Sequence, residues 1–135
     1  VAFIILAGQF SRNVFRGQDT GSSSDTVALA ASKSAINQKW DLRVDEPARQ
    51  FFYMPLMHSE NLIDQDRCVR LLKERMRDGG GHNLLHARAH REVIRNFGRF
   101  PDRNSALSRK SSQAEADFIR DGGYGNLFQN LTVPI

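Results

Sequence analysis

The sequence predicts an all-α domain, and three observations lead to that fold class. Segments with the 3.6-residue apolar spacing of a helix recur along the chain, with Gly and Pro placed between them. No segment keeps the apolar–polar alternation of a half-buried strand for more than a few residues. The chain has 135 residues, of which 40% are hydrophobic and 25% charged, and this composition suits one globular domain.

The composition also excludes several classes of protein. Cys68 is the only cysteine, so a disulfide scaffold is excluded and a reducing, cytoplasmic compartment is expected. No apolar run reaches the ~20 residues that cross a bilayer, so we expect no membrane partner. The net charge is +4, and only four of the 19 basic side chains are lysine, which raises the question of an anionic partner.

The chain opens on an apolar run, and the first predicted helix extends to about residue 13. Its apolar side chains point in all directions, which is typical of a helix buried on every side. We therefore expect that residues preceding Val1 cover it in the natural chain. The polar stretch at 18–24 predicts a loop, and Asp25 is the expected N-cap of an Ala-rich helix over 27–39.

Prolines mark the next boundaries. Residues 40–44 and 99–109 are expected to be irregular connectors. Pro47 suits the first turn of a helix over 48–56, because its missing N–H costs least there. Pro55 should kink or end that helix.

Glycines mark the ends of the two longest predicted helices. Ser59 is the expected cap of a helix over 60–78, which the three glycines at 79–81 should stop. A second long helix is expected over 83–97, with Gly98 ending it.

The last predicted helix is short. Ser112 and Glu115 have the spacing of a capping box, and the glycines at 122–123 should close the helix that it opens. We expect the helical domain to span 1–123 and the tail at 124–135 to be irregular.

The helix at 83–97 is expected to place His86 and His90 in the middle of its apolar face. That face consists of Ala89, Val93, Ile94 and Phe97. The outward face carries a stripe of arginines at Arg88, Arg91, Arg95 and Arg99.

The helix at 60–78 is expected to bury Gln65 in the same way. Its apolar face consists of Leu62, Cys68, Val69, Leu72 and Met76. Because a buried polar group needs hydrogen-bond partners, Gln65 and His90 require them. The expected partners come from the neighbouring helix start, at His58, Ser59 and Glu60.

Three patterns in the sequence can be explained either by chemistry or by a structural role. His82, His86 and His90 have a spacing that can place ligands for zinc or another transition metal on one helix face. Hydrogen-bonded or surface histidines are favoured, because H-E-x-x-H is absent, and neither a metal nor another cofactor is predicted.

The tripeptide at 58–60, with Asp64 one turn on, contains the residue types of general acid–base catalysis. Capping by Ser59 and the favourable position of Glu60 at a helix N-terminus explain it without a reaction. A structural role is therefore favoured, and no catalytic residue is predicted. Cys68 has no activating base and is expected to be a buried thiol.

Arginine occurs in two distinct settings. The outward stripe could contact nucleic acid, but acids such as Glu92 interrupt it and no binding motif is present, so a solvated face is favoured. Two Arg-Asn pairs instead follow aromatic residues at helix ends: Arg12–Asn13 and Arg103–Asn104. They can clamp helix ends, which is the favoured interpretation, or line one pocket and donate to an anionic or carbonyl ligand.

Three separated motifs, in this order along the chain, carry a family resemblance. They are Gln9-Phe10-Ser11-Arg12-Asn13 with Phe15-Arg16-Gly17, then Tyr53-Met54-Pro55-Leu56-Met57-His58-Ser59-Glu60 with Asp64-Gln65, then Phe97-Gly98-Arg99-Phe100-Pro101 with Arg103-Asn104. The chain resembles the bacterial domain of unknown function 924 family over nearly its whole length apart from the tail. The resemblance implies a tetratricopeptide-like arrangement of antiparallel helix pairs, and it implies that an N-terminal portion of typical members is absent here.

The resemblance implies no established activity, but it singles out ten polar positions. They are Arg12, Asn13, His58, Ser59, Glu60, Gln65, His90, Arg99, Arg103 and Asn104. The chain departs from the family pattern at Gly8, Ser11, Asp102 and Ser108, where the family usually has Asp, Pro, His and Gly.

The sequence therefore predicts a helical binding module that recognises a peptide or a small anionic ligand through these ten positions. An alternative is a hydrolase-like enzyme with His58 or His90 as base and Arg side chains on an oxyanion. A further alternative is that all these groups are structural hydrogen-bonding partners. Convergence on a solvent-accessible pocket would distinguish the functional interpretations from the structural one.

Overall fold

The computed structural model describes residues 20–132, and every regular element in that range is a helix. The predicted all-α class is therefore confirmed for this part of the chain, whereas the tetratricopeptide-like arrangement stays a prediction. The first predicted helix and the pair Arg12–Asn13 lie outside the described residues. Between residues 20 and 132, no helix has both the length and the hydrophobicity of a membrane span.

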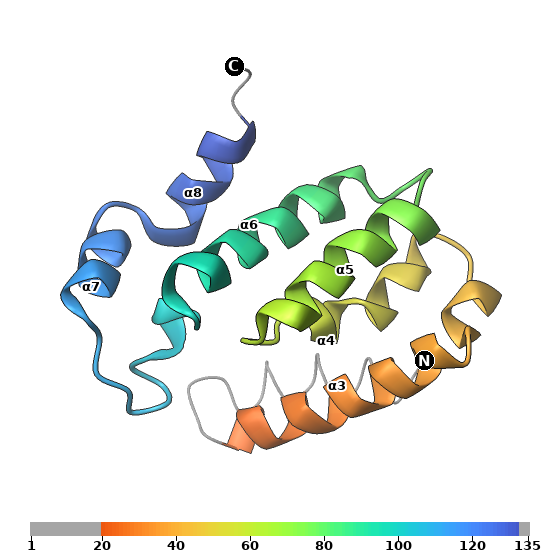
Figure 1. The fold of residues 1–135 in the computed structure, drawn as a ribbon, viewed down its shortest axis with the longest axis horizontal. Helices are drawn as coiled ribbons and strands as arrows, with labels where there is room; N and C mark the ends of the chain where they lie inside the picture. The colour runs from red at the N-terminus through yellow and green to blue at the C-terminus, as the bar shows by residue number, and fades with distance from the viewer. Residues whose placement is uncertain (1–19, 133–135) are drawn as a thin grey trace.

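The first half of the described chain builds a stack of helices against α3 (Thr20–Asn37). Two short 3-10 helices, η2 (Trp40–Arg43) and η3 (Ala48–Phe52), lead from α3 to α4 (Met54–Met57). The helix α4 packs between α3 and α5 (Leu62–Arg75), as Figure 1 shows.

The second half adds an antiparallel partner and a C-terminal cap. The helix α6 (Gly81–Phe97) runs back along α5 after a short connection (Figure 1). Beyond it come η4 (Pro101–Arg103), α7 (Gln113–Arg120) and α8 (Gly123–Thr132), and α8 packs against α6. The end of α6 is therefore the place where α5, η4, α7 and α8 approach one another.

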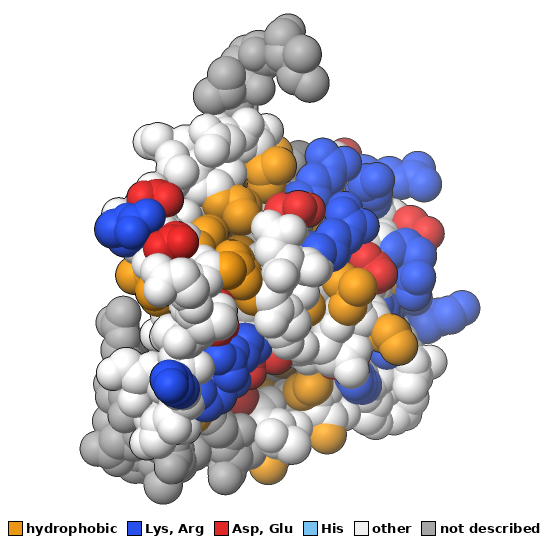
Figure 2. Space-filling view, turned by 60° about the vertical axis from the view of Figure 1, so that its left-hand side comes forward, with side chains coloured by type: hydrophobic (Ala, Val, Ile, Leu, Met, Phe, Trp, Pro, Cys, Tyr) orange, Lys and Arg blue, Asp and Glu red, His pale blue; other side chains and the backbone are white. Residues whose placement is uncertain are grey.

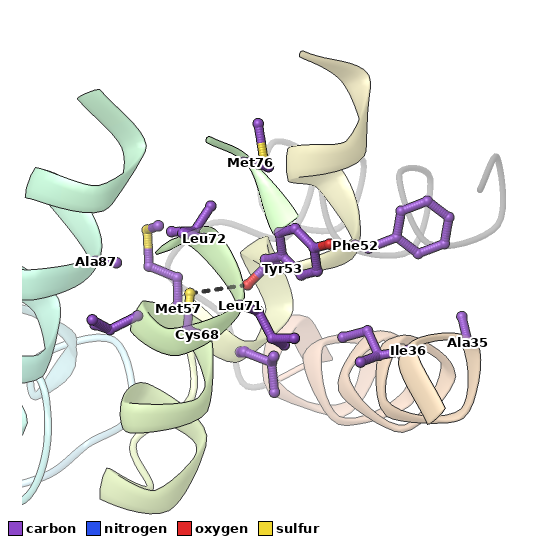
Figure 3. Close-up of a cluster of buried hydrophobic side chains, with 12 residues drawn as sticks. Ala35, Ile36, Phe52, Tyr53, Met57, Cys68, Leu71, Leu72, Met76 and Ala87 are labelled. Atoms are coloured by element: carbon purple, nitrogen blue, oxygen red, sulfur yellow. Dashed lines mark hydrogen bonds between the residues drawn. The ribbon is translucent and has the colours of Figure 1, made fainter. Parts of the chain in front are cut away.

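The main hydrophobic core joins α3, α4, α5 and the first half of α6 (Figure 3). Tyr53, Leu56 and Leu72 are each at most 1% exposed, and full burial of one such side chain contributes about 1.5–3 kcal/mol. Cys68 lies in the same core, where burial raises the pKa of its thiol to about 12. The prediction of a buried thiol is confirmed.

A smaller cluster lies at the C-terminal end of α6. Val93, Ile94 and Phe100 are buried there. The partly buried side chains that pack on them come from α6, α7 and α8: Phe97, Phe118, Tyr124 and Leu127. This second cluster forms the floor of the site described below.

Two predicted helix ends are confirmed. The hydroxyl of Ser112 accepts a hydrogen bond from the Glu115 N–H at 3.1 Å, and the Glu115 carboxylate accepts one from the Ser112 N–H at 2.9 Å, which completes the capping box. Gly98 ends α6 in the left-handed region at φ 72°, a conformation that glycine adopts without steric cost.

The start of α3 differs from the prediction. From Thr20 onward the predicted loop is helical, so Asp25 lies within α3 and is not its N-cap. Serine and glycine favour turns locally, but α3 buries Ala28, Ser32 and Ala35 along one stripe. Packing of that stripe stabilises the helix beyond what its first turns could achieve alone.

Two further boundaries differ. Pro55 lies in the first turn of α4, where a proline is tolerated, and begins a helix that it was expected to end. The N-cap of α5 is Asn61, whose side-chain oxygen accepts from the Ile63 N–H at 2.8 Å. The hydroxyl of Ser59 instead donates to Asp64 at 2.7 Å, so the predicted Ser59 cap is wrong.

The tail prediction is also wrong, because residues 123–132 form α8. Its glycines and asparagines obscure the helical spacing of its apolar residues, which are Tyr124, Leu127, Phe128 and Leu131. Contact with α6 supplies the stabilisation that local propensity does not.

Candidate functional site

Six of the ten predicted site residues fall into two groups at the C-terminal end of α6, where Arg109 and Glu115 join them. One group is a set of paired charges and amides that we call the helix-end network: Glu60, Arg99, Asn104, Arg109 and Glu115. The other group consists of His58, His90 and Arg103, which line a pocket that η4 helps to form.

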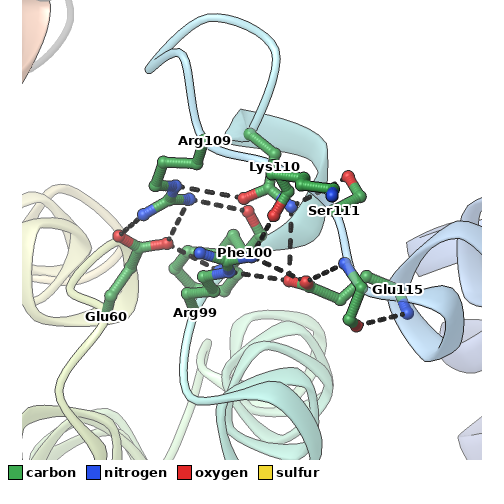
Figure 4. A network of polar contacts seen from close by, with 9 residues as sticks. Glu60, Arg99, Phe100, Arg109, Lys110, Ser111 and Glu115 are labelled. Atoms are coloured by element: carbon green, nitrogen blue, oxygen red, sulfur yellow. Dashed lines mark hydrogen bonds and ion pairs between the residues drawn. The ribbon is translucent and has the colours of Figure 1, made fainter.

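In the helix-end network, two arginines each hold a carboxylate through two nitrogens (Figure 4). Arg99 donates to both oxygens of Glu115 at 2.7 and 2.8 Å. Arg109 donates to both oxygens of Glu60 at 2.8 and 3.0 Å. Such forked pairs are among the strongest polar contacts in proteins, because both hydrogen bonds are charge-assisted.

Asn104 joins the two ion pairs. Its side-chain oxygen accepts from Arg109 at 3.0 Å, and its amide nitrogen donates to Glu115 at 3.3 Å. The Phe100 N–H donates to Glu60 at 2.6 Å, which anchors the start of η4. The network therefore ties the residues before α5 to η4 and α7.

The electrostatics of the network favour the charged carboxylates. Hydrogen bonds from Arg109 and from the Phe100 N–H lower the pKa of Glu60, although burial opposes this. Hydrogen bonds from Arg99 and Ser112 hold the pKa of Glu115 well below its usual range. Both carboxylates are therefore ionised and paired at neutral pH. The network clamps helix ends, which is the role that the sequence analysis favours for Asn104.

Arg99 is placed differently from its predicted position in an outward, solvated stripe. It lies against Glu115, and its remaining contact is a hydrogen bond to the Lys110 carbonyl at 2.7 Å. The heptad-like spacing of the arginines suggested a single exposed face, but Gly98 turns the chain before Arg99 is reached.

Gln65 and Ser59 make hydrogen bonds between α5 and the residues that precede it. Gln65 is fully buried and donates to the backbone carbonyls of Met57 and Ser59 at 2.6 and 2.7 Å. The predicted burial of Gln65 is confirmed, and its partners are backbone carbonyls. Ser59 donates to Asp64, which also pairs with Lys33 at 2.9 Å.

The pocket has a volume of about 390 Å³ and lies between the end of α6, η4 and the α7–α8 unit. Residues from these elements and from the end of α4 line it: His58, His90, Val93, Phe100, Asp102, Arg103, Phe118, Ile119, Gly122, Gly123 and Tyr124. Pockets for small molecules usually measure about 300–1,000 Å³ and combine apolar walls with a few polar groups. This pocket has both properties.

Arg103 provides the positive charge of the pocket. Its guanidinium carbon lies 4.6 Å from the centre of the Phe100 ring, and one nitrogen donates to the His58 carbonyl at 2.9 Å. Among residues 20–132, no carboxylate lies within ion-pair distance of it. Arg103 therefore keeps several N–H donors and its charge for an external partner, whereas each arginine of the helix-end network is paired with a carboxylate.

His90 provides a hydrogen-bond acceptor. Its Nδ1 lies 2.7 Å from the His86 carbonyl, which can only accept, so Nδ1 carries the proton and Nε2 is unprotonated in the neutral ring. Burial lowers the pKa of His90, and the charges of both Arg103 and Asp102 act on it. The ring packs 5.8 Å from His58 and 4.8 Å from Tyr124, measured between ring centres.

The wall on the α8 side depends on a second histidine. The Tyr124 hydroxyl lies 2.5 Å from Nδ1 of His86, and the His86 ring stacks on Phe128 at 4.3 Å. Nε2 of His86 lies 3.1 Å from Nε2 of His82. These contacts hold α8 on α6 and so position one side of the pocket.

Several contributing residues were not identified from the sequence. Arg109 has Asn104 and Glu60 as partners 5 and 49 positions away, and no local spacing indicates the second pair. Tyr124 lay in the predicted irregular tail. Asp102 was noted only as a departure from the family pattern.

A separate buried network near η2 was also not anticipated. Asp41 is fully buried and accepts hydrogen bonds from Tyr53 and, through both oxygens, from Arg75. Burial and the hydrogen bond to Asp41 raise the pKa of Tyr53. This network lies at the α3 end of the molecule and is satisfied internally.

Metal and nucleic-acid sites were weighed against the same geometry. In the described range, no group of three or more His, Cys, Asp or Glu side chains is arranged to hold a metal. On the face drawn in Figure 2, acidic side chains lie among the basic ones. Arg91 and Arg95 share Asp66 as a partner at 3.4 and 4.0 Å. The absence of nucleic-acid binding stays a prediction, as does the cytoplasmic location.

Comparison with known proteins agrees with the motifs. The family described as "Bacterial protein of unknown function (DUF924)" matches residues 1–123. The chain belongs to this family. No curated protein matches it.

A solved structure extends the comparison to the fold. The protein of unknown function ATU0120 from Agrobacterium tumefaciens is 36% identical, with a TM-score of 0.80. The match covers 88% of this chain and 65% of that protein, so this chain spans less than two thirds of its length. The family match ends at residue 123, whereas Tyr124 of α8 also lines the pocket.

Proposed function

We propose that this member of the family binds a small organic anion in the pocket at the end of α6. The main support is the state of Arg103. Its guanidinium lines an aromatic-walled pocket and has no carboxylate partner among the described residues. The arginines of the neighbouring network are paired with Glu60 and Glu115. An arginine without a carboxylate partner, beside arginines that have one, marks the place where an external anion is best accommodated.

The walls support a ligand with an apolar body. Phe100, Phe118 and Tyr124 line the pocket together with Val93 and Ile119. A carboxylate on Arg103 would place an attached apolar group against these side chains and remove it from water. The volume of about 390 Å³ favours a small molecule over an extended peptide.

The test is a pair of matched compounds and a set of matched variants. We expect 3-phenylpropionate to raise the melting temperature and to give a measurable Kd by calorimetry, whereas its uncharged amide should bind at least about tenfold more weakly. Arg103→Gln should abolish binding of the anion, and Arg103→Lys should retain part of it. Arg120→Gln is the control, because Arg120 is exposed and does not line the pocket.

Equal binding of the acid and the amide would refute recognition through Arg103. Failure of 3-phenylpropionate, 4-methylpentanoate and phenyl phosphate to bind the folded protein would refute an organic-anion pocket of this size. Retention of binding in Arg103→Gln would locate the anion elsewhere.

A hydrolytic activity is the second candidate, and the unprotonated Nε2 of His90 favours it. A neutral imidazole acceptor opposite an arginine can activate water while the arginine stabilises an oxyanion. The residues that line the pocket include no serine, threonine or cysteine, so a water nucleophile is required. Hydrolysis of p-nitrophenyl 3-phenylpropionate that is lost in His90→Gln, with 3-phenylpropionate binding retained, would support this activity.

A further inference from the structure

The pocket presents charges of both signs on adjacent residues. Asp102 and Arg103 both belong to η4 and both line the pocket. They are not paired with each other, and within residues 20–132 the Asp102 carboxylate makes no ion pair with any other cation. Both charges act on His90, which lines the same pocket.

His90 adds a hydrogen-bond acceptor to the same pocket. With Nδ1 donating to the His86 carbonyl, Nε2 can only accept while the ring is neutral. A ligand group close to His90 and Asp102 is therefore a hydrogen-bond donor, and a positively charged donor also satisfies the carboxylate. A simple monocarboxylate would leave both acceptors without a partner.

Resting on the proposed function, we propose that the anion is an aminocarboxylate the size of an α-amino acid, with an apolar side chain. Its carboxylate binds Arg103, its ammonium group binds Asp102 and donates to Nε2 of His90, and its side chain packs against Phe118 and Tyr124. The single cationic, single anionic and apolar surfaces of the pocket match the three parts of such a molecule.

Size and exposure agree with this ligand. The volume of about 390 Å³ is near the lower end for small-molecule pockets, which suits an amino acid better than a nucleotide or a longer peptide. Asp102 is exposed at the rim, so its contact with an ammonium group is partly screened by water. We therefore expect the ammonium group to improve affinity by about three- to tenfold.

Two compound pairs that differ only by the amino group test this inference. They are L-phenylalanine with 3-phenylpropionate, and L-leucine with 4-methylpentanoate. Calorimetry on the whole chain should give a lower Kd for the amino acid in at least one pair. N-acetyl-L-phenylalanine, which keeps the carboxylate but has an uncharged amide nitrogen, should lose that advantage.

Variants assign the effect to a residue. Asp102→Asn should remove the preference for the amino acid and should not weaken binding of the matching simple acid, because it takes away only a negative charge. Asp66→Asn is the matched control, because Asp66 is exposed on α5 and does not line the pocket. A preference that persists in Asp102→Asn would overturn the assignment to Asp102.

The outcomes separate this inference from the proposed function. If the simple acids bind and the amino acids bind no better, the aminocarboxylate is overturned while the anion pocket stands. If neither member of either pair binds, both are overturned. If the N-acetylated compound binds as tightly as the free amino acid, the ligand is the carboxyl end of a peptide and the inference is wrong.

Discussion

Two groups of similar side chains lie near η4, and they differ in how many of their charged groups already have a partner. In the helix-end network, Arg99 and Arg109 each hold a carboxylate through two nitrogens. In the pocket, Arg103 makes one hydrogen bond to a carbonyl and lies against an aromatic ring. Residue type and membership of a motif therefore do not distinguish a structural clamp from a binding site. The separation lies in which donors and acceptors the fold has already paired.

The largest effect that would test the comparison is loss of a network carboxylate. Glu115→Ala removes both hydrogen bonds from Arg99 and one half of the capping box. We expect the free energy of unfolding to fall by about 3 kcal/mol, because a nearly buried acceptor of charged donors is lost. Urea denaturation measures the change. Asp117→Ala, at a half-exposed position of the same helix, should change it by about 0.5 kcal/mol or less.

The two arginines next to η4 give the direct comparison. Arg109→Gln leaves Glu60 without its forked partner, and we expect it to destabilise the protein by about 2 kcal/mol. Arg103→Gln removes one hydrogen bond to a carbonyl and should cost about 1 kcal/mol or less. Denaturation curves of both variants measure the difference. If Arg103→Gln were the more destabilising of the two, Arg103 would be a structural residue. The proposal of an anion-binding pocket would then lose its main support.

A substitution next to the helix-end network should stabilise the protein. Ser108 precedes Arg109 and has a φ of 55°, in the left-handed region that glycine adopts without steric cost. The family resemblance implies glycine at this position, and this backbone conformation favours glycine. Ser108→Gly should therefore stabilise the protein by about 0.5–1 kcal/mol, observed as a rise in melting temperature. A fall would show that the serine side chain contributes more than the backbone strain costs.

The smallest expected effect is the loss of stability at acid pH. The pocket and the helix-end network should lose stability in different pH ranges. Burial lowers the pKa of His90 and His86 in the folded state below 6.5, so the unfolded chain binds protons first. Their contribution is complete above pH 6.5 and is lost as the pH falls below it. The facing charges at His90 are Arg103, which opposes its protonation, and Asp102, which favours it.

The network responds only at lower pH. The folded-state pKa values of Glu60 and Glu115 lie below 4.5, so their contribution is present above pH 4.5 and is lost as the pH falls further. Melting temperatures measured from pH 7.5 to pH 3 should show two declines. His86→Gln with His90→Gln should flatten the first decline and leave the second. A single decline below pH 4.5 would contradict the histidine contribution.

Much of the local structure could be predicted because it depends on neighbours in the chain. The capping box at Ser112 and the Gly98 helix end involve residues within four positions of one another. The burial of Gln65 and the inward position of His90 follow from helical periodicity alone. The start of α3 and the existence of α8 could not be predicted, since packing against α4 and α6 overrides weak local propensity there.

The sequence by itself determined an all-helical chain, the inward placement of its polar residues and its family. Only the tertiary structure decided which of those residues are paired. The partners Glu60 and Arg109 are 49 positions apart, and Arg103 reaches the carbonyl of His58 across 45. Periodicity specifies the direction in which a side chain points, whereas pairing depends on how separate helices pack, and no local pattern encodes that distance.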